Sequence, residues 1–191
     1  MADVPSAPEV ARRLADALEA AAIPYAVGGA IAYGLHAPPR ATNDVDLNVF
    51  VPAEDLDPVL DALEAGGARV DREASRRSAE DRGDFRVTVS GMRVDVFVPS
   101  IPICHEAAGR TREGTLRGRP IRVLSAEDLA VFKLLFFRGK DLLDVERLVA
   151  FQGPALDTGY IRRWLVDLVG EADERVAWWD CRVPLAPVPV P

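Results

Sequence analysis

The chain of 191 residues has few of the side chains that most often build zinc, haem or disulfide sites. It contains two cysteines, Cys104 and Cys181, and two histidines, His36 and His105. None of the four stands at a spacing typical of a zinc ligand set. Two cysteines so far apart indicate reduced thiols rather than a disulfide framework. We therefore expect neither a zinc nor a haem site.

The chain also lacks a long apolar run. No stretch approaches the ~18 residues that a membrane-spanning helix requires. The first residues, Met-Ala-Asp-Val-Pro, have no basic segment followed by an apolar one. A hydrophobic content of 49% and a charged content of 28% are ordinary for a globular protein. The expectation is a cytoplasmic protein that makes no membrane contact.

Lysine is scarce, because only Lys133 and Lys140 are lysines among the 23 basic residues. The net charge of −7 counts mildly against a nucleic-acid partner. The arginines cluster in residues 69–86 and again in residues 110–122. Acidic residues interrupt the first cluster, which is typical of a solvated loop. The second cluster contains a single acidic residue, Glu113, and is the better candidate for an RNA or substrate contact.

A glycine pair, Gly28 and Gly29, follows an apolar run and precedes a helical pattern over residues 30–35. Glycine has no Cβ, and the N-terminus of a helix is partly positive. A Gly-Gly turn that enters a helix therefore lets backbone N–H groups approach a phosphate closely. In isolation, such a turn is more often only a tight connection.

A pair of carboxylates, Asp44 and Asp46, follows shortly after in the strand-like run Asp-Val-Asp-Leu-Asn-Val-Phe. Successive side chains of a strand point to opposite faces, so both carboxylates project from one face. Carboxylates on one face can share a hard cation such as Mg²⁺. The alternative is a half-exposed strand that shows its polar face to water.

A third carboxylate, Asp95, lies in the middle of an apolar strand. Residues 85–98 read as a hairpin that turns at Ser90-Gly91. Taken alone, Asp95 would be a surface aspartate paired with Arg86 or Arg93. The occurrence of three carboxylates on two adjacent strands favours a functional site.

These residues together resemble the polymerase-β-type nucleotidyltransferase superfamily, which combines a Gly-Gly or Gly-Ser turn, a D-x-D strand and a third acid on a neighbouring strand. Residues 28–47 and 125–149 further resemble the AbiEii-type nucleotidyltransferases, which include MenT-like bacterial toxins. In that group a lysine-bearing helix precedes an Arg/Lys-Asp-x-x-Asp stretch, and the matching positions here are Lys133, Lys140, Asp141 and Asp144. Many relatives have serine where this chain has Gly29, so phosphate binding here would depend more on backbone N–H groups.

The resemblance implies an α+β fold, in which helices flank a nucleotidyltransferase sheet and a helical C-terminal portion follows. We expect a catalytic core over residues 1–100 and the mostly helical portion over 101–183. The Pro-rich tail, residues 184–191, is expected to be extended. The sequence patterns predict helices over 7–22, 52–66, 129–137, 140–151 and 160–169, strands near Tyr25 and over 44–51, and a second hairpin around Arg117-Gly118.

The implied reaction is an in-line displacement at the α-phosphate of an NTP that releases pyrophosphate. Two Mg²⁺ ions, or Mn²⁺, would be held by Asp44, Asp46 and Asp95. The resemblance assigns nucleotide binding to Gly28, Gly29, Arg40, Thr42, Lys133 and Lys140, and catalysis to Asp44, Asp46, Asp95, Lys133 and Asp141.

Three side chains near these positions have alternatives. Asp141 and Asp144 would fix Lys140 or a substrate group, or form an ordinary charged helix face with Arg138 and Arg147. A phosphate on Thr42 would compete with the triphosphate. Alternatively, Thr42 only hydrogen-bonds the loop that leads into the strand.

The acceptor has more than one candidate. Resemblance to MenT-like toxins implies nucleotide addition to the 3′ end of tRNA, which blocks translation, and restraint by a cognate antitoxin. A small-molecule nucleotidyltransferase of the aminoglycoside-modifying kind shares the glycine turn and the D-x-D strand, and an acidic groove suits a cationic acceptor. The remaining alternative is an inactive module that only binds a partner, against which the intact acidic triad counts.

Overall fold

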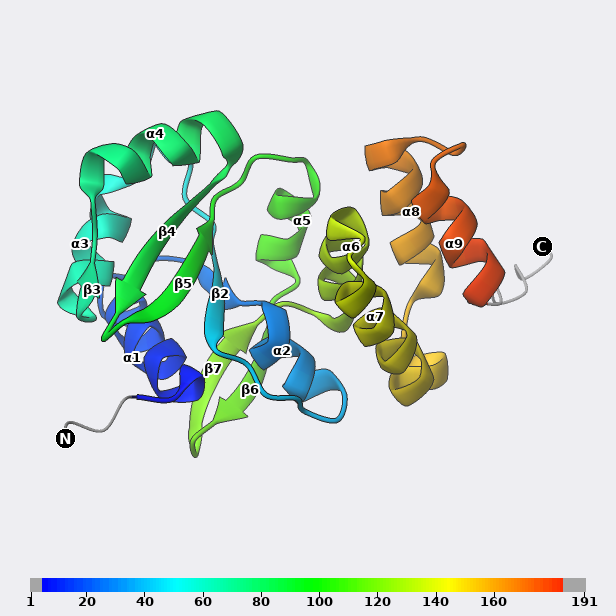
Figure 1. Cartoon of the computed structure of the whole chain (residues 1–191), viewed down its shortest axis with the longest axis horizontal. Coiled ribbons are helices and arrows are strands. Elements are labelled where there is room, and N and C mark those ends of the chain that lie inside the picture. Colours follow the sequence, from blue (N-terminus) through cyan, green and yellow to red (C-terminus); the bar gives the residue numbers. More distant parts are fainter. Residues whose placement is uncertain (1–4, 184–191) are drawn as a thin grey trace. The chain divides into compact units, whose positions relative to one another are not determined.

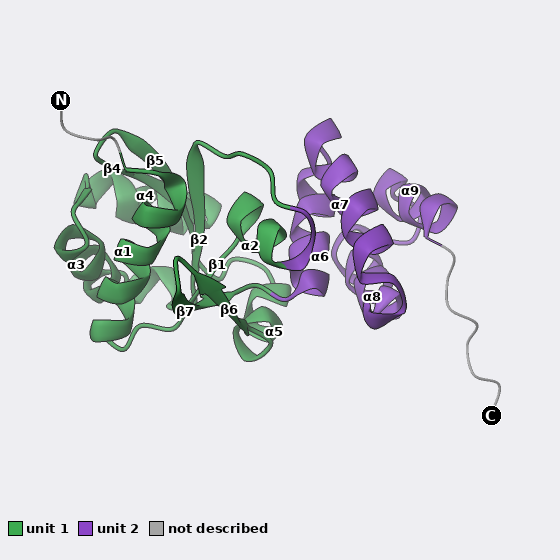
Figure 2. Cartoon of the chain, turned by 90° about the horizontal axis from the view of Figure 1, so that it is seen from below, with its two compact units in different colours: residues 1–35, 39–124 green, residues 36–38, 125–191 purple. Residues whose placement is uncertain are grey.

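The computed structural model describes residues 5–183 and divides into two compact units (Figure 2). The first unit comprises residues 1–35 and 39–124, and the second comprises residues 36–38 and 125–191. The first unit continues beyond residue 100, where the sequence analysis ended the catalytic core, because the hairpin of residues 112–123 joins the same sheet. The predicted tail, residues 184–191, lies outside the described residues.

The first unit is built on a mixed seven-stranded sheet (Figure 1). The strand order is β3-β4-β5-β2-β1-β7-β6. β2 pairs in parallel with β5 and antiparallel with β1, and β1 pairs in parallel with β7. The strands are β1 (Tyr25–Val27), β2 (Asp44–Val49), β3 (Ala68–Arg69), β4 (Asp84–Val89), β5 (Met92–Phe97), β6 (Arg112–Leu116) and β7 (Arg119–Val123). This sheet with its helices belongs to the α+β class that the sequence predicts.

The helices of the first unit are α1 (Ala7–Ala20), α2 (Gly29–His36), the 3-10 turn η1 (Ala53–Asp55), α3 (Asp57–Ala65), α4 (Arg72–Arg82) and α5 (Ile103–Gly109). Ser6 and Glu9 form a capping box at the start of α1. The apolar stripe of α1, with Val10, Leu14 and Leu18, is fully buried, and the helix packs against β1, β2 and β7. This packing makes one face of the sheet the core of the unit.

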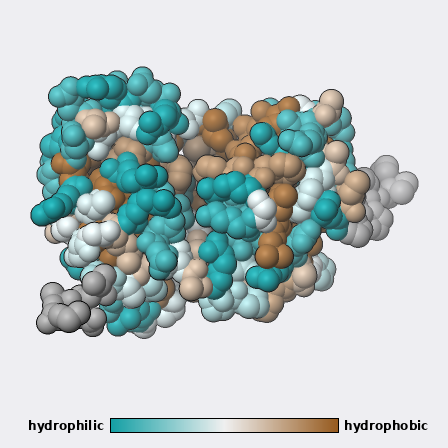
Figure 3. Space-filling view, viewed as in Figure 1, coloured by the Kyte–Doolittle hydropathy of each residue, from teal (hydrophilic) through white to brown (hydrophobic). Residues whose placement is uncertain are grey.

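The sequence analysis treated residues 69–86 as a solvated loop, and most of this segment is the helix α4. The Asp71 carboxylate accepts a hydrogen bond from the Ala74 N–H at 3.1 Å and begins the helix, while Gly83 ends it with φ of 77°. The helix is polar throughout, and Figure 3 shows hydrophilic residues gathered over it at the top left. Because α4 has no apolar stripe to bury, ion pairs with α3 stabilise it instead.

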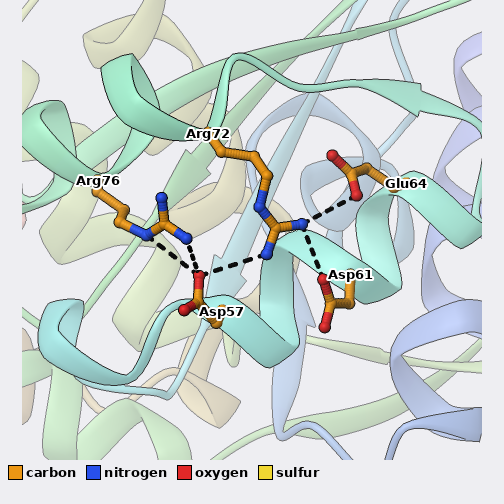
Figure 4. Close-up of polar contacts among 5 residues, drawn as sticks. All are labelled: Asp57, Asp61, Glu64, Arg72 and Arg76. Carbon is orange, nitrogen blue, oxygen red and sulfur yellow. Dashed lines mark hydrogen bonds and ion pairs between the residues drawn. The ribbon is translucent and has the colours of Figure 1, made fainter.

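An ion-pair network ties α4 to α3 (Figure 4). The guanidinium of Arg72 contacts Asp61 at 2.8 Å, Glu64 at 2.9 Å and Asp57 at 3.3 Å. The Nε of Arg76 donates to Asp57 at 3.1 Å. Asp57, Asp61 and Glu64 recur at helical spacing, so they project from one side of α3. The hydrogen bond from Arg76 is the main cause that lowers the pKa of Asp57.

The second unit consists of helices in its described part: α6 (Ala126–Phe136), α7 (Gly139–Gln152), the 3-10 turn η2 (Gly153–Ala155), α8 (Thr158–Val169) and α9 (Glu174–Arg182). The helices α5 and α9 were not predicted from the sequence patterns. The buried carboxylate of Asp128 accepts hydrogen bonds from Ser125 Oγ and Tyr160 Oη, both at 2.6 Å, and so links α6 to α8. In residues 5–183 no helix has the length and apolar character needed to cross a membrane.

Candidate active site

The strands β2, β5 and β4 bring polar side chains to one face of the sheet. The opposite face buries Val45, Leu47 and Val49 of β2, because side chains alternate along a strand. The register across the three strands sets the side chains of this face in rows, and all of them but Phe97 are polar. One row is Asp46, Asp95 and Arg86, the next is Asp44, Arg93 and Thr88, and the third is Asn48, Phe97 and Asp84. We call this surface the acidic face.

Asp46 and Asp95 are direct neighbours in the parallel register of β2 and β5. The three carboxylates predicted from the sequence therefore lie on one face of the sheet. Asp44 lies on the same face, one row away. The alternation of side chains predicted that Asp44 and Asp46 share a face. The pairing of β2 with β5 shows in addition that Asp46 and Asp95 are adjacent.

Each of Asp44 and Asp95 is paired with arginine. Asp44 forms an ion pair with Arg93 and accepts a hydrogen bond from Thr42 Oγ1 at 2.5 Å. Asp95 accepts from the Nε of Arg86 at 2.7 Å and lies 3.3 Å from the Nε of Arg93. The hydrogen bond to Asp95 is the main cause that raises the pKa of Arg86. Both partners proposed for Asp95 from the sequence are thus present, and the pairing of Arg93 with Asp44 was missed.

Gly29 lies against the carboxylate of Asp46. A Cβ built on Gly29 would stand 1.7 Å from Asp46 Oδ2, and the backbone has φ of +53°. A serine at this position would clash in this backbone, which explains physically why the residue is glycine here. The N–H of Gly28 donates to the carbonyl of Asp46 at 2.9 Å. The backbone contact with β2 thus engages the N–H of Gly28, one of the two N–H groups that the sequence resemblance assigns to nucleotide binding.

Arg40 and Thr42 lie in the connection between α2 and β2 and line a groove of about 500 Å³. Ile31 and Leu35 of α2, together with Met92, form other parts of its wall. The lining is adjacent in sequence to the acidic face, since Thr42 stands two residues before Asp44. The bond from Thr42 to Asp44 corresponds to the alternative in which this hydroxyl supports the loop entering the strand.

The donor set suits a hard divalent cation in residue type and in register. Asp44, Asp46 and Asp95 supply the oxygen ligands that Mg²⁺ prefers. Within residues 5–183, however, no three His, Cys, Asp or Glu side chains are arranged around a common point where a metal ion could sit. The carboxylates of Asp44 and Asp95 face guanidinium groups instead. Metal binding here would exchange guanidinium contacts for cation contacts.

In the second unit, Lys133 is buried and held by two aspartates. Its Nζ donates to Asp144 Oδ2 at 2.8 Å and lies 3.8 Å from Asp141 Oδ1. Lys133 is 5% exposed, and both aspartates are 2% exposed. Arg138 donates from Nε to Asp141 Oδ2 at 2.5 Å.

The hypothesis that Asp141 and Asp144 fix Lys140 is wrong. α6 ends at Phe136, and the left-handed φ of 53° at Phe137, the next residue, breaks the helix before α7 begins. α7 packs back on α6, which brings both aspartates onto Lys133, while Lys140 is exposed. Lys133 and Lys140 therefore do not share one continuous helix, and the buried aspartates are not an ordinary solvated helix face.

The mixed sheet and its acidic face agree with the α+β nucleotidyltransferase core that the sequence resemblance implies. A family model described as aminoglycoside-2''-adenylyltransferase matches residues 10–150, and the chain belongs to this family. No curated protein matches the chain. The fold class and the enzyme class expected from the sequence are confirmed. The narrower likeness to the AbiEii-type group stays a resemblance of the sequence.

Solved structures share the fold at low sequence identity. The solution structure of the antibiotic-resistance factor ANT(2'')-Ia has a TM-score of 0.63 and 16% identity, over 84% of this chain and 91% of that one. A crystal structure of ANT(2'')-Ia in complex with adenylyl-2''-tobramycin has a TM-score of 0.58 and 19% identity, over 80% and 95%. An antigenic nucleotidyltransferase-like protein from Paracoccidioides brasiliensis has a TM-score of 0.53 and 17% identity, over 93% and 94%.

Proposed function

We propose that the chain transfers a nucleotidyl group from an NTP to a hydroxyl group of a small cationic acceptor of the aminoglycoside kind. The observation that carries the proposal is the register of Asp46 beside Asp95 on the acidic face. The family match over residues 10–150 supports the same reaction class. The name of the family and the adenylylated tobramycin bound by ANT(2'')-Ia favour ATP as the nucleotide.

Asp44, Asp46 and Asp95 would hold the divalent cation, Mg²⁺ or Mn²⁺. Bound there, it would lower the pKa of the acceptor hydroxyl and neutralise charge on the departing pyrophosphate. The protein positions the two substrates, and positioning together with charge neutralisation supplies most of the rate. In this proposal Asp95 would accept the proton that leaves the hydroxyl.

The strand order separates the glycine turn from Asp95, because they lie on opposite sides of β2. β1 and the Gly28–Gly29 turn lie on one side of β2, and β5 and β4 lie on the other. The triphosphate would therefore lie toward Gly29 and the first turn of α2, with Arg40 and Thr42 nearby.

The overall charge agrees with a cationic acceptor. A net charge of −7 favours small cations over the phosphate backbone of a nucleic acid. The toxin hypothesis, with tRNA as acceptor and a cognate antitoxin, has no contact in the described residues that favours it. It depended in part on a lysine offered to phosphate, and Lys133 is instead buried against Asp144. Lys140 is exposed, and its contact with a phosphate stays a prediction from the sequence.

The test is a transfer assay with the purified chain, each of the four NTPs labelled at the α-phosphate, and Mg²⁺. One arm contains a panel of aminoglycosides and the other contains total tRNA. We expect label on an aminoglycoside, stoichiometric pyrophosphate, and no transfer in EDTA. Label on tRNA 3′ ends alone would contradict the acceptor and favour the toxin. Absence of transfer in both arms would contradict the proposed reaction.

A further inference from the structure

Arg93 connects two strands of the acidic face through their carboxylates. It stands opposite Asp44 in the register of β5 and β2, and it pairs with that carboxylate. It also lies two residues from Asp95 on its own strand, with its Nε 3.3 Å from Asp95 Oδ2. One guanidinium therefore contacts two of the three proposed metal ligands.

We propose that Arg93 is an internal counter-ion that divalent cation and nucleotide displace together. It holds Asp44 and Asp95 in register before the cation binds. It then releases them and takes a phosphate oxygen of the nucleotide. This rests on the proposed function, because it requires both a metal and an NTP at the acidic face.

Charge balance gives the reason for the exchange. Three carboxylates on one face repel one another unless cations lie among them. Arg86 and Arg93 reduce that repulsion and leave a single net negative charge among the five side chains. Without nucleotide, a divalent cation is repelled by the Arg93 guanidinium and competes with it for Asp44 and Asp95, so the cation binds weakly. A triphosphate supplies the anion that both the cation and Arg93 require, so metal and nucleotide should bind cooperatively.

The exposure of Arg93 makes the exchange feasible. Its side chain is 46% exposed, whereas the ammonium-bearing side chain of Lys133 is 6% exposed. An ion pair near the surface is worth little and can be broken and formed again, while breaking a buried one is costly. Arg86 pairs with Asp95 and is 61% exposed, but it does not bridge β2 and β5 as Arg93 does. Of the two arginines, Arg93 is thus the one that positions carboxylates on both β2 and β5.

The experiment measures Mn²⁺ binding to the full chain by electron paramagnetic resonance, with and without a non-hydrolysable NTP analogue. The variants are Arg93→Met, which removes the charge, and Arg93→Lys, which keeps it. The matched control is Arg77→Met, because Arg77 is an exposed arginine that pairs with Glu73 of its own helix, α4. Circular dichroism establishes that each variant is folded.

Without nucleotide, Arg93→Met should bind Mn²⁺ about three- to tenfold more tightly than the wild type, as expected for the loss of one or two exposed ion pairs. The analogue should then improve its Mn²⁺ affinity by a smaller factor than in the wild type. Arg93→Lys should restore part of this coupling, and Arg77→Met should behave as the wild type. Equal or weaker Mn²⁺ binding by folded Arg93→Met would overturn the role of Arg93. A wild type that binds no Mn²⁺ with or without nucleotide would instead contradict the proposed function itself.

Discussion

Gly29 and Asp46 lie so close together that no other residue fits at position 29 without moving the carboxylate. A Cβ on Gly29 would stand 1.7 Å from Asp46 Oδ2, 2.5 Å from its Cγ and 2.9 Å from its Cβ. The glycine turn and the D-x-D strand are therefore one structural feature rather than two. The turn limits where the Asp46 carboxylate, a proposed metal ligand, can lie.

The first prediction is that Gly29→Ala disrupts the site, whereas Gly139→Ala does not. Alanine at φ of +53° costs about 1–2 kcal/mol of backbone strain, and it must also displace Asp46. Gly139 begins α7, and nothing lies within 4 Å of a Cβ placed there. Thermal unfolding and initial transfer rates of the two variants provide the check. Equal activity in both would show that Asp46 tolerates displacement.

The second prediction concerns Lys133. Lys133→Met leaves Asp144 and Asp141 buried without their ammonium partner, and breaking such a pair costs about 3–5 kcal/mol. Urea unfolding followed by tryptophan fluorescence reports on the second unit, because the three tryptophans, Trp164, Trp178 and Trp179, lie there. Lys140→Met, at an exposed lysine, should change the midpoint little.

Kinetics separate this structural role from a phosphate contact. If Lys133 binds the triphosphate, Lys133→Arg should retain part of the nucleotide affinity, and Lys133→Met should raise KM for the NTP in protein that is still folded. We expect stability rather than KM to change. If Lys133→Met leaves the urea midpoint unchanged and raises KM for the NTP, Lys133 contacts the nucleotide, and the structural role is contradicted.

The third prediction is a pH-dependent contribution from the α3–α4 network. Arg76 lowers the pKa of Asp57 below its usual value of 3.8, so the folded state favours the charged carboxylate. A group with a depressed folded pKa stabilises the protein above its unfolded pKa, and this contribution is lost as the pH falls through the folded pKa. Arg76→Met should therefore lower Tm at pH 7, and its difference from the wild type should vanish in strong acid.

The control for that network is Arg77→Met. Arg77 pairs with Glu73 within α4, so its loss does not separate α4 from α3. Salt at roughly 1 M should also reduce the effect of Arg76→Met, because screening weakens exposed pairs. A Tm difference for Arg76→Met that persists unchanged at low pH would contradict the electrostatic origin.

The local sequence pattern was sufficient to predict the acidic face. It could not predict which side chains of neighbouring strands lie next to each other on that face. Alternation of buried valines with aspartates placed Asp44 and Asp46 on one face, because the side-chain period of a strand is two. The neighbour of Asp46 depends on the register between β2 and β5, which are distant in sequence. The pairing of Arg93 with Asp44 depends on the same register, so no local signal could show it.

Where tertiary contacts override local pattern, the sequence predictions failed. Residues 72–82 have no apolar stripe, so they read as a loop, yet Arg72 and its three carboxylate partners hold them as a helix against α3. Asp141 and Asp144 stand next to Lys140 in sequence, which favoured that partner. The left-handed backbone at Phe137 reverses the chain and gives them Lys133 instead.

Asp46→Asn gives the most direct test of the central claim, that the acidic face is the site of nucleotidyl transfer. The substitution keeps the shape of the side chain and removes a charge that the metal requires. Initial rates of α-labelled NTP transfer to the acceptor would be compared for the wild type, Asp46→Asn and Asp81→Asn, an exposed position on α4. We predict more than ~10²-fold loss in folded Asp46→Asn and a normal rate in Asp81→Asn. A near-normal rate in folded Asp46→Asn would contradict the claim.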